Sequence, residues 1–311
     1  MKIGLKNKRK TKMWLINVLV LIFLVESSWA DCYPWKPDTQ VIGKVAFEII
    51  TPDDSLKDVA KRHQIGFEAL KSANPGLERL PMASNYVLLI PKQFVLPRLK
   101  PGINVNLAER RLYLIDEEHD KVCTYPVSIG RVGWETPQGD FSVVEKLYKP
   151  PWILPKSIRQ FEAKRGVTLP QVVPPGKENP LGEYALRLSS PTYLIHVNFV
   201  PDKVGLRSTS GCISLFSDHM EELYHMVSKG TPVHIFHQPV KVGKLNGQSY
   251  LESHQPMSES VEDYENEGQD RANLLIKEFA SISPSMKSNL NGVKPYLLST
   301  VGIPQVIKEF F

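Results

Sequence analysis

The sequence lacks an apolar run long enough to cross a membrane. The apolar stretch at residues 13–25 has 13 residues, whereas a transmembrane helix needs about 20. Six basic residues precede this stretch, and Ser28-Trp29-Ala30 follows it as a small-x-small cleavage signature. The pattern predicts a signal peptide at residues 1–30, cleaved near Ala30, with no stable membrane span remaining. An uncleaved N-terminal anchor is the alternative interpretation.

The mature chain also lacks an excess of charge of either sign. The whole sequence carries a net charge of +5, and residues 1–30 alone account for +5. The basic excess therefore belongs to the signal, where positive charge orients insertion, and no nucleic-acid partner is predicted. A hydrophobic fraction of 42% with 25 prolines is typical of a globular protein with loop-rich parts.

Cysteine is scarce, and its count is odd. Export leads to an oxidising compartment where disulfides persist, and three cysteines leave at least one thiol unpaired. The sequence does not decide whether Cys32 and Cys123 form a disulfide. Such a bridge would leave Cys212 free, within the small-residue stretch RSTSGCISL. A free thiol in that setting is a candidate nucleophile.

The eight histidines show no metal-ligand spacing such as H-x-x-x-H, so no metal site is predicted. In the strand-like TYLIHVNF, His196 shares one face with Leu194 and Asn198. A cysteine nucleophile needs a base and backbone donors for an oxyanion, and His196 and Gly211 are the candidates. Two adjacent antiparallel strands can bring residues 196 and 212 into contact, although the sequence alone does not show that they do. A hydrogen-bonded strand histidine is the alternative interpretation.

Strands do not alternate with long helices, which argues against a parallel α/β fold. Residues 102–238 carry repeated strand signals and one clear helix, SDHMEELYHMVSKG, and predict a mainly β catalytic domain. The proline-rich insert at residues 150–182 predicts an active-site lid, or else a surface loop. Residues 239–311 are expected to be a C-terminal extension, partly polar linker, with short helices at RANLLIKEFASI and PQVIKEFF.

Residues 44–92 predict a small strand–helix–helix–strand unit. The segment begins with PDDSL, continues with AKR in its first helix and ANPG at the turn, and closes with an apolar strand ending in IP. On these features it resembles a LysM module. The resemblance implies a domain that binds N-acetylglucosamine-containing glycans, mainly peptidoglycan or chitin.

A second resemblance spans about residues 40–255. The segments YPVSIGRVGWETPQGDFSV, VVPPGKENPLGEYALRL and YLIHVNFVPDKVGLRSTSGCISL resemble the L,D-transpeptidase (YkuD-type) catalytic domain. They are most similar to the periplasmic ErfK/YbiS-like subgroup of Gram-negative bacteria. The motifs are T-P-x-G from Thr136, P-x-G-x-x-N-P-x-G from Pro174, I-H at His196 and S-G-C at Cys212. The resemblance implies a β-sandwich with a lid insert and one helix.

The resemblance also implies a mechanism without metal or nucleotide cofactor. Cys212 is implied as the nucleophile, which attacks a diaminopimelate carbonyl in a tetrapeptide stem, releases D-alanine and forms a thioester. His196 is implied as the proton donor and acceptor, and the Gly211 backbone as an oxyanion donor. Further candidates for substrate contacts are Arg207, a possible partner for a carboxylate, together with Asn198, Ser210 and the lid aromatic Trp152.

Two positions depart from the family pattern. The frequent S-H-G-C has Ser210 in place of its histidine, and Ser214 stands where arginine or asparagine is usual. The second departure puts a substrate-orienting or loop-bracing contact in question.

The resemblance implies a periplasmic enzyme with peptidoglycan as its partner, while the acceptor stays open. A second stem peptide would give a 3–3 cross-link, a lysine of an outer-membrane protein a tether, and a free D-amino acid an exchange product. Water would make the protein a hydrolase. A non-catalytic, LysM-containing wall-binding protein is the alternative from a different class.

Overall fold

The computed structural model describes residues 30–77, 86–190, 192–257, 268–285 and 290–307. The predicted signal peptide therefore lies outside the described residues except for Ala30. Among the described ranges, no helix combines the length and the apolar character that a membrane crossing requires.

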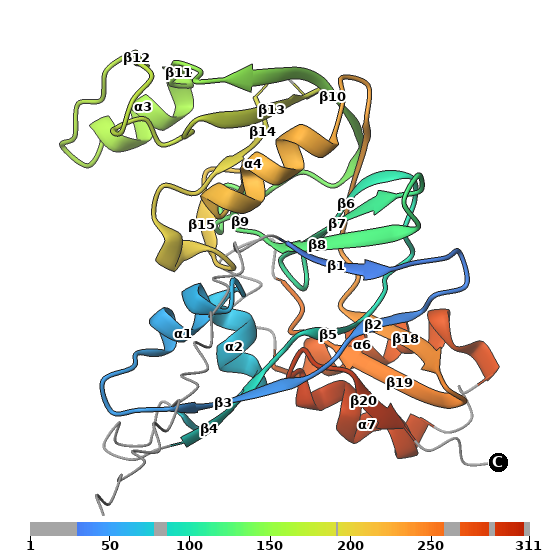
Figure 1. Ribbon diagram of the computed structural model, residues 1–311. Coiled ribbons are helices and arrows are strands. Elements are labelled where there is room, and N and C mark those ends of the chain that lie inside the picture. The colour runs from blue at the N-terminus through green and yellow to red at the C-terminus, as the bar shows by residue number, and fades with distance from the viewer. Residues whose placement is uncertain (1–29, 78–85, 191, 258–267, 286–289, 308–311) are drawn as a thin grey trace, which may run out of the picture.

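One nine-stranded sheet forms the centre of the molecule (Figure 1). Its nine strands form eight neighbouring pairs, of which two, β6–β17 and β14–β16, are parallel and the others antiparallel. In spatial order the strands are β1 (Asp31–Pro34), β8 (Lys121–Pro126), β7 (Arg111–Asp116), β6 (Gly102–Asn106), β17 (Pro232–Phe236), β10 (Gly139–Tyr148), β13 (Tyr184–Leu188), β14 (Leu194–Val197) and β16 (Ile213–Leu215).

The sheet curls until its two sides meet. Ser128, which directly extends β8, exchanges two backbone hydrogen bonds with Ser214 of β16, at 2.8 and 3.0 Å. The apolar side chains inside the curl form the main core, and α4 (Ser217–Met226) covers it with buried Met220 and Leu223. The prediction of a β-sandwich with one helix for residues 102–238 is therefore corrected: together with β1, these residues build one curled sheet, and they carry two α-helices, α3 (Lys156–Ala163) and α4. The fold as a whole is mixed α/β, with six α-helices in the described residues.

The predicted strand–helix–helix–strand unit is present as β3 (Ala46–Ile50), α1 (Leu56–Arg62), α2 (Phe67–Ala73) and β4 (Tyr86–Ile90). The side chain of Ser55 accepts a hydrogen bond from the backbone N–H of Asp58 and so begins α1 with a capping box. Val59, Leu70 and Leu88 are fully buried in a core separate from the main one. This unit contacts the sheet domain through Gly66 and Gly205, whose backbones approach closely.

The described residues of the C-terminal extension form a packed module (Figure 1). Its strands are β18 (Val240–Leu245), β19 (Gln248–Ser253) and β20 (Gln305–Ile307), and its helices are α6 (Gly268–Ile282) and α7 (Leu290–Ser299). The helix expected at RANLLIKEFASI is present, whereas the one expected at PQVIKEFF is wrong because residues 305–307 pair with β19. The acidic stretch at 258–267 lies outside the described residues.

A buried ion cluster joins this module to the sheet domain. The ammonium of Lys241, fully buried, lies 2.6 Å from Glu109 and 2.8 Å from Glu252. Tyr113 donates a hydrogen bond to Glu109 at 2.8 Å, and the backbone N–H of Val95 donates to Glu252 at 2.6 Å. The sheet domain and the C-terminal module therefore share one buried group of interacting charges. The short strand pair β2 (Val41–Gly43) and β5 (Gln93–Val95) shares an apolar cluster with Tyr113.

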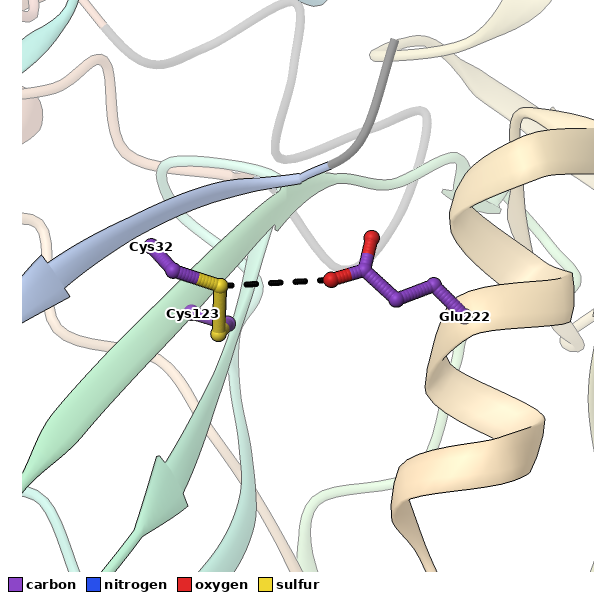
Figure 2. A group of neighbouring side chains, drawn as sticks. All are labelled: Cys32, Cys123 and Glu222. Carbon is purple, nitrogen blue, oxygen red and sulfur yellow. Dashed lines mark hydrogen bonds between the residues drawn. A yellow bond between two sulfur atoms is a disulfide. The ribbon is translucent and has the colours of Figure 1, made fainter. Parts of the chain in front are cut away.

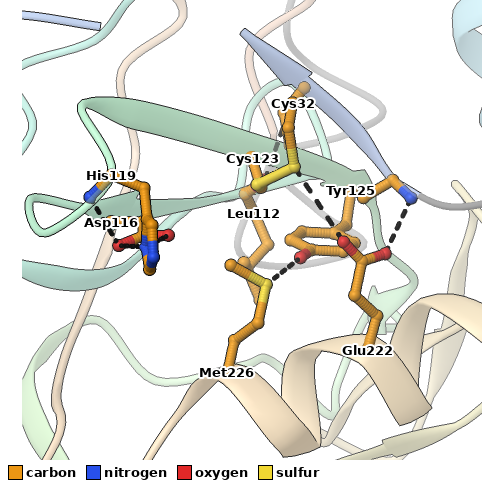
Figure 3. Close-up of a disulfide and its surroundings, with 10 residues drawn as sticks. Cys32, Leu112, Asp116, His119, Cys123, Tyr125, Glu222 and Met226 are labelled. Atoms are coloured by element: carbon orange, nitrogen blue, oxygen red, sulfur yellow. Dashed lines mark hydrogen bonds and ion pairs between the residues drawn. A yellow bond between two sulfur atoms is a disulfide. The ribbon is translucent and has the colours of Figure 1, made fainter. Parts of the chain in front are cut away.

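A disulfide between Cys32 and Cys123 cross-links β1 to β8, where the two residues face each other in register (Figure 2). Glu222 of α4 points at this bridge, with one carboxylate oxygen 3.9 Å from the Cys32 sulfur (Figure 2). The other oxygen accepts a hydrogen bond from the backbone N–H of Ala30 at 2.7 Å (Figure 3). The disulfide and the hydrogen bond to Ala30 thus hold the beginning of the described chain at two points. Burial raises the pKa of Glu222.

Candidate active site

All three cysteines lie in the described part of the chain, so the Cys32–Cys123 bridge leaves Cys212 as the free thiol. Cys212 lies at a cavity of about 670 Å³. The cavity is lined by residues of the curled sheet, including His196 and Asn198, and by residues of the insert at 150–182. This volume is in the range typical of small-molecule and peptide pockets.

Parallel pairing places the histidine and the cysteine on one face. In the register of β14 and β16, His196 is opposite Ser214, and Leu194 is therefore at the level of Cys212. Residues 212 and 214 point to the same face of their strand segment, which is also the face of His196. The expectation of antiparallel strands is wrong, but the two side chains still line the same cavity.

The imidazole of His196 is neutral at physiological pH. Its Nδ1 lies 2.7 Å from the carbonyl oxygen of Val197, and because a carbonyl only accepts, Nδ1 carries the proton. Nε2 then keeps the lone pair that a base needs. Burial lowers the pKa of His196 to about 4, although hydrogen bonds to the carbonyls of Val197 and Pro180 act in the opposite direction.

The thiol of Cys212 is also neutral in the free protein. Burial against the cavity floor raises the pKa of Cys212, and the backbone N–H of Leu194 partly opposes this by hydrogen bonding to the sulfur. A neutral thiol beside a neutral imidazole favours proton transfer during attack over a preformed ion pair.

The backbone around the thiol is held by two threonines. The hydroxyl of Thr209 accepts a hydrogen bond from the Gly211 N–H at 3.2 Å and donates one to the Cys212 carbonyl at 2.5 Å. The hydroxyl of Thr136 donates to the Gly211 carbonyl at 2.9 Å. The T-P-x-G motif therefore braces the S-G-C motif. The Gly211 N–H, predicted to be an oxyanion donor, is bonded to Thr209 in this structure.

Gly211 is required by the turn in which it lies. Its φ is +103°, a conformation that residues with a side chain rarely adopt. A Cβ atom at this position would lie 2.7 Å from Cε1 of Tyr193, closer than real contacts allow. The tyrosine ring thus packs directly on the bare glycine backbone next to the sulfur.

Ser214, which departs from the family pattern, braces the loop from inside. Its hydroxyl is buried and accepts a hydrogen bond from the Asn198 amide at 3.1 Å. The same amide donates to Ser128 at 2.9 Å, and Ser128 donates to the Lys203 carbonyl at 2.7 Å. The predicted substrate contact Asn198 lines the cavity, but its amide nitrogen is already used by this network.

The insert at residues 150–182, called the lid below, forms one wall of the cavity. It contains β11 (Trp152–Ile153), α3 (Lys156–Ala163) and β12 (Val172–Val173), and it lies at one end of the sheet (Figure 1). Trp152 lines the cavity, as the sequence led us to expect. Both ends of the lid are tied by the buried amide of Asn179, which donates to the carbonyl of Pro150 at 2.8 Å and to that of Pro174 at 3.2 Å.

Of the two remaining predicted substrate contacts, Ser210 and Arg207, only Ser210 lines the cavity. Ser210 lines the cavity, and its hydroxyl accepts a hydrogen bond from Arg131 at 2.8 Å. Arg207 is not among the described residues that line the cavity; it pairs with Glu135 at 3.8 Å and donates to the Gly130 carbonyl at 3.3 Å. Sequence reasoning missed Arg131, because one arginine after a glycine carries no signal by itself.

Comparison with known proteins agrees with this geometry. The family model of the L,D-transpeptidase catalytic domain (YkuD) matches residues 100–235. The probable L,D-transpeptidase YcfS of Escherichia coli K12 is 35% identical over 266 residues, covering 82% of this chain and 83% of that protein. The probable L,D-transpeptidase ErfK/SrfK of the same strain is 34% identical over 286 residues, covering 89% of each.

This chain belongs to the L,D-transpeptidase family. It is therefore an enzyme, a cysteine-dependent transferase that acts on peptidoglycan. Among solved structures, the catalytic domain of the Enterococcus faecium L,D-transpeptidase is 22% identical, covers 45% of this chain and 100% of that one, and has a TM-score of 0.35. The family match at 100–235 does not extend to the strand–helix–helix–strand unit.

Proposed function

We propose that Cys212 of this L,D-transpeptidase takes an acyl group from a peptidoglycan tetrapeptide stem and passes it to an amine. The observation that carries this proposal is the placement of the one free thiol and His196 on the same face of two neighbouring strands, at one cavity of about 670 Å³. The acceptor amine belongs either to a second stem, giving a 3–3 cross-link, or to an outer-membrane protein that becomes attached to diaminopimelate.

The chemistry follows from the two neutral groups. As the Cys212 sulfur attacks the carbonyl carbon, its proton passes to Nε2 of His196. The bond to D-alanine then breaks, the imidazolium returns the proton to the leaving amine, and a thioester remains. The acceptor amine attacks the thioester, gives its proton to His196, and the sulfur leaves and regains a proton.

Backbone N–H groups at Gly211 and Cys212 are the proposed donors to the oxyanion of each tetrahedral intermediate. Because the Gly211 N–H donates to the Thr209 hydroxyl in the free protein, it must give up this hydrogen bond to bind the oxyanion. Trp152 of the lid is proposed to contact the stem peptide, since it lines the same cavity.

The remaining parts of the chain support a location at the cell wall. We propose that residues 44–92 are a LysM peptidoglycan-binding domain, supported by the observed β3–α1–α2–β4 order and its separate core. We also propose that residues 1–30 direct export to the periplasm, which agrees with the disulfide between Cys32 and Cys123.

The test uses the mature protein and a purified disaccharide tetrapeptide. Cys212→Ala should abolish release of D-alanine, and intact-mass analysis should find a carbapenem adduct on the wild type but not on the variant. Turnover that persists in a folded Cys212→Ala protein would refute the nucleophile assignment. Mass analysis of peptidoglycan from cells lacking the gene then names the acceptor, through loss either of 3–3 dimers or of protein-linked stems.

A further inference from the structure

The guanidinium of Arg131 lies between the lid and the segment that carries the free thiol. That segment, residues 208–212, is called the cysteine loop here. Arg131 follows β9 (Ile129–Gly130), which pairs in parallel with β15 (Arg207–Thr209) and so brings Arg131 beside Thr209. It also lines the cavity that contains Cys212.

On one side, Arg131 holds the cysteine loop through three hydrogen bonds. Its Nη1 donates to the Ser210 hydroxyl at 2.8 Å and to the Thr209 carbonyl at 3.3 Å. Its backbone N–H donates to the same carbonyl at 3.0 Å. Hydrogen bonds from a charged donor are about twice as strong as neutral ones, so this contact restrains the two residues before Gly211.

On the other side, the same guanidinium packs against two aromatic rings. Its Cζ lies 4.9 Å from the ring centre of Trp134 and 5.2 Å from that of Phe161 in the lid helix α3. The two rings contact each other edge to face, with centres 5.5 Å apart. Such cation–π contacts are stabilising, and more so when the cation is partly removed from water.

The lid helix reaches the cysteine loop through Phe161. None of the residues of α3 is fully buried, and Phe161 contacts both Arg131 and Trp134, which links this helix to the cysteine loop. The acidic group facing Arg131 from the lid is Glu162, whose carboxylate pairs with Arg165 at 3.3 Å. Burial lowers the pKa of Arg131, while the charge of Glu162 acts in the opposite direction.

We propose that Arg131 is a positioning residue that couples the closed lid to the geometry of the cysteine loop. With the lid in place, Phe161 and Trp134 hold the guanidinium, and the guanidinium holds Thr209 and Ser210. Thr209 in turn bonds to the Gly211 N–H and the Cys212 carbonyl, which orients the backbone beside the sulfur. The inference rests on the proposal that Cys212 is the nucleophile.

This arrangement makes a specific kinetic prediction. Acylation needs both the thiol and correctly placed backbone donors, whereas alkylation by iodoacetamide needs only the thiol. A misplacement of about 1 Å at a reacting group costs up to about 100-fold in rate. Arg131→Ala should therefore lower the rate constant of Cys212 acylation by a carbapenem about 10- to 100-fold at saturation, with alkylation changed less than about threefold.

Further variants separate positioning from general damage. Arg131→Lys keeps a charged donor for Ser210 but no planar face for the rings, so its acylation rate should be intermediate. Millimolar guanidinium ion should restore part of the rate in Arg131→Ala and leave the wild type unchanged. Phe161→Leu should also slow acylation, and its effect should not add to that of Arg131→Ala. Arg165→Ala is the matched control, because Arg165 lies over the same ring at 5.6 Å without touching the cysteine loop.

Two outcomes overturn the inference: wild-type acylation in Arg131→Ala, or an equal loss of acylation and alkylation without guanidinium rescue. If Arg131→Ala does not fold, Arg131→Lys and Phe161→Leu decide in the same way, since wild-type acylation in both refutes the coupling. The underlying assignment fails separately. Persistent turnover in Cys212→Ala removes the nucleophile, whereas an inactive Cys212→Ala with normal Arg131 variants removes only the role of Arg131.

Discussion

His196 stands opposite Ser214, not opposite Cys212, in the parallel pair of β14 and β16. The imidazole and the thiol therefore point to the same face of the sheet, but they are offset by two residues along the strands. The paired Ser214 is buried and bonded to Asn198, so it fills the place beside the histidine without contributing a charge. His196, Cys212 and Ser214 all line the same cavity.

The low pKa of His196 predicts an unusual acid limit for the reaction. A base must be unprotonated, and His196 has a pKa of about 4 because of burial, so the free enzyme stays competent well below pH 6.5. We expect the rate of Cys212 acylation by a carbapenem to fall with an apparent pKa near 4. A fall centred between pH 6 and 7 would contradict this assignment, and His196→Gln should abolish acylation at every pH.

Replacement of Gly211 tests the tight packing beside the sulfur. Gly211→Ala forces a side chain into a backbone with φ of +103° and against the Tyr193 ring. We expect a loss of about 1–3 kcal/mol in the free energy of unfolding, together with loss of acylation. Gly133→Ala is the matched control, since Gly133 has φ of +78° with nothing within 4 Å of the added Cβ. Gly133→Ala should lower the free energy of unfolding through backbone strain alone. Equal rates of acylation in Gly133→Ala and Gly211→Ala would refute the argument that the Tyr193 ring excludes a side chain at position 211.

The buried His219 predicts sensitivity to acid. Neither of its ring nitrogens has a hydrogen-bond partner among the described residues, and its ring packs between Tyr125 and Phe216. Burial, helped by the charges of Arg111 and Lys92, lowers the pKa of His219 to about 3. The unfolded chain takes up a proton below about pH 6.5, so stability is complete above that pH and is lost as the pH falls toward 3.

We therefore expect His219→Phe to reduce the difference in the free energy of unfolding between pH 7.5 and pH 4.5 by roughly 2–3 kcal/mol. Urea denaturation at both pH values measures it. The exposed His225, on the same helix α4, supplies the control. His225→Phe should leave the difference as in the wild type, and an unchanged difference in His219→Phe would show that another group causes the acid sensitivity.

The ion cluster around Lys241 predicts that the C-terminal module depends on one ammonium. Lys241→Met removes the ammonium that pairs with the buried carboxylates of Glu109 and Glu252. Breaking a buried pair in this way costs about 3–5 kcal/mol, so we expect a matching drop in the free energy of unfolding. The exposed Lys277 of α6 is the control, and a Lys241→Met protein as stable as Lys277→Met would contradict the prediction.

Local patterns were sufficient for the elements whose signals lie in neighbouring residues. The helices α1 and α4 follow from the spacing of their apolar residues, and both form in the segments where that spacing indicates a helix. The lid was predicted from its prolines, and it lines the cavity with Trp152. The strand β20 was misjudged because three residues gain a β conformation only by pairing with β19. Such pairing is not visible in the segment itself.

The sequence by itself determined which chemical groups are available: an odd number of cysteines, a histidine in a strand-like segment, a glycine before Cys212 and a family pattern around them. Only the tertiary structure decided how they meet, because contacts between distant segments depend on strand order and sheet curl. The parallel register of His196, the bracing by Ser214, and the hold of Arg131 on Ser210 all arise from elements that are separate in sequence. The same curl that joins Ser128 to Ser214 brings these groups to one cavity.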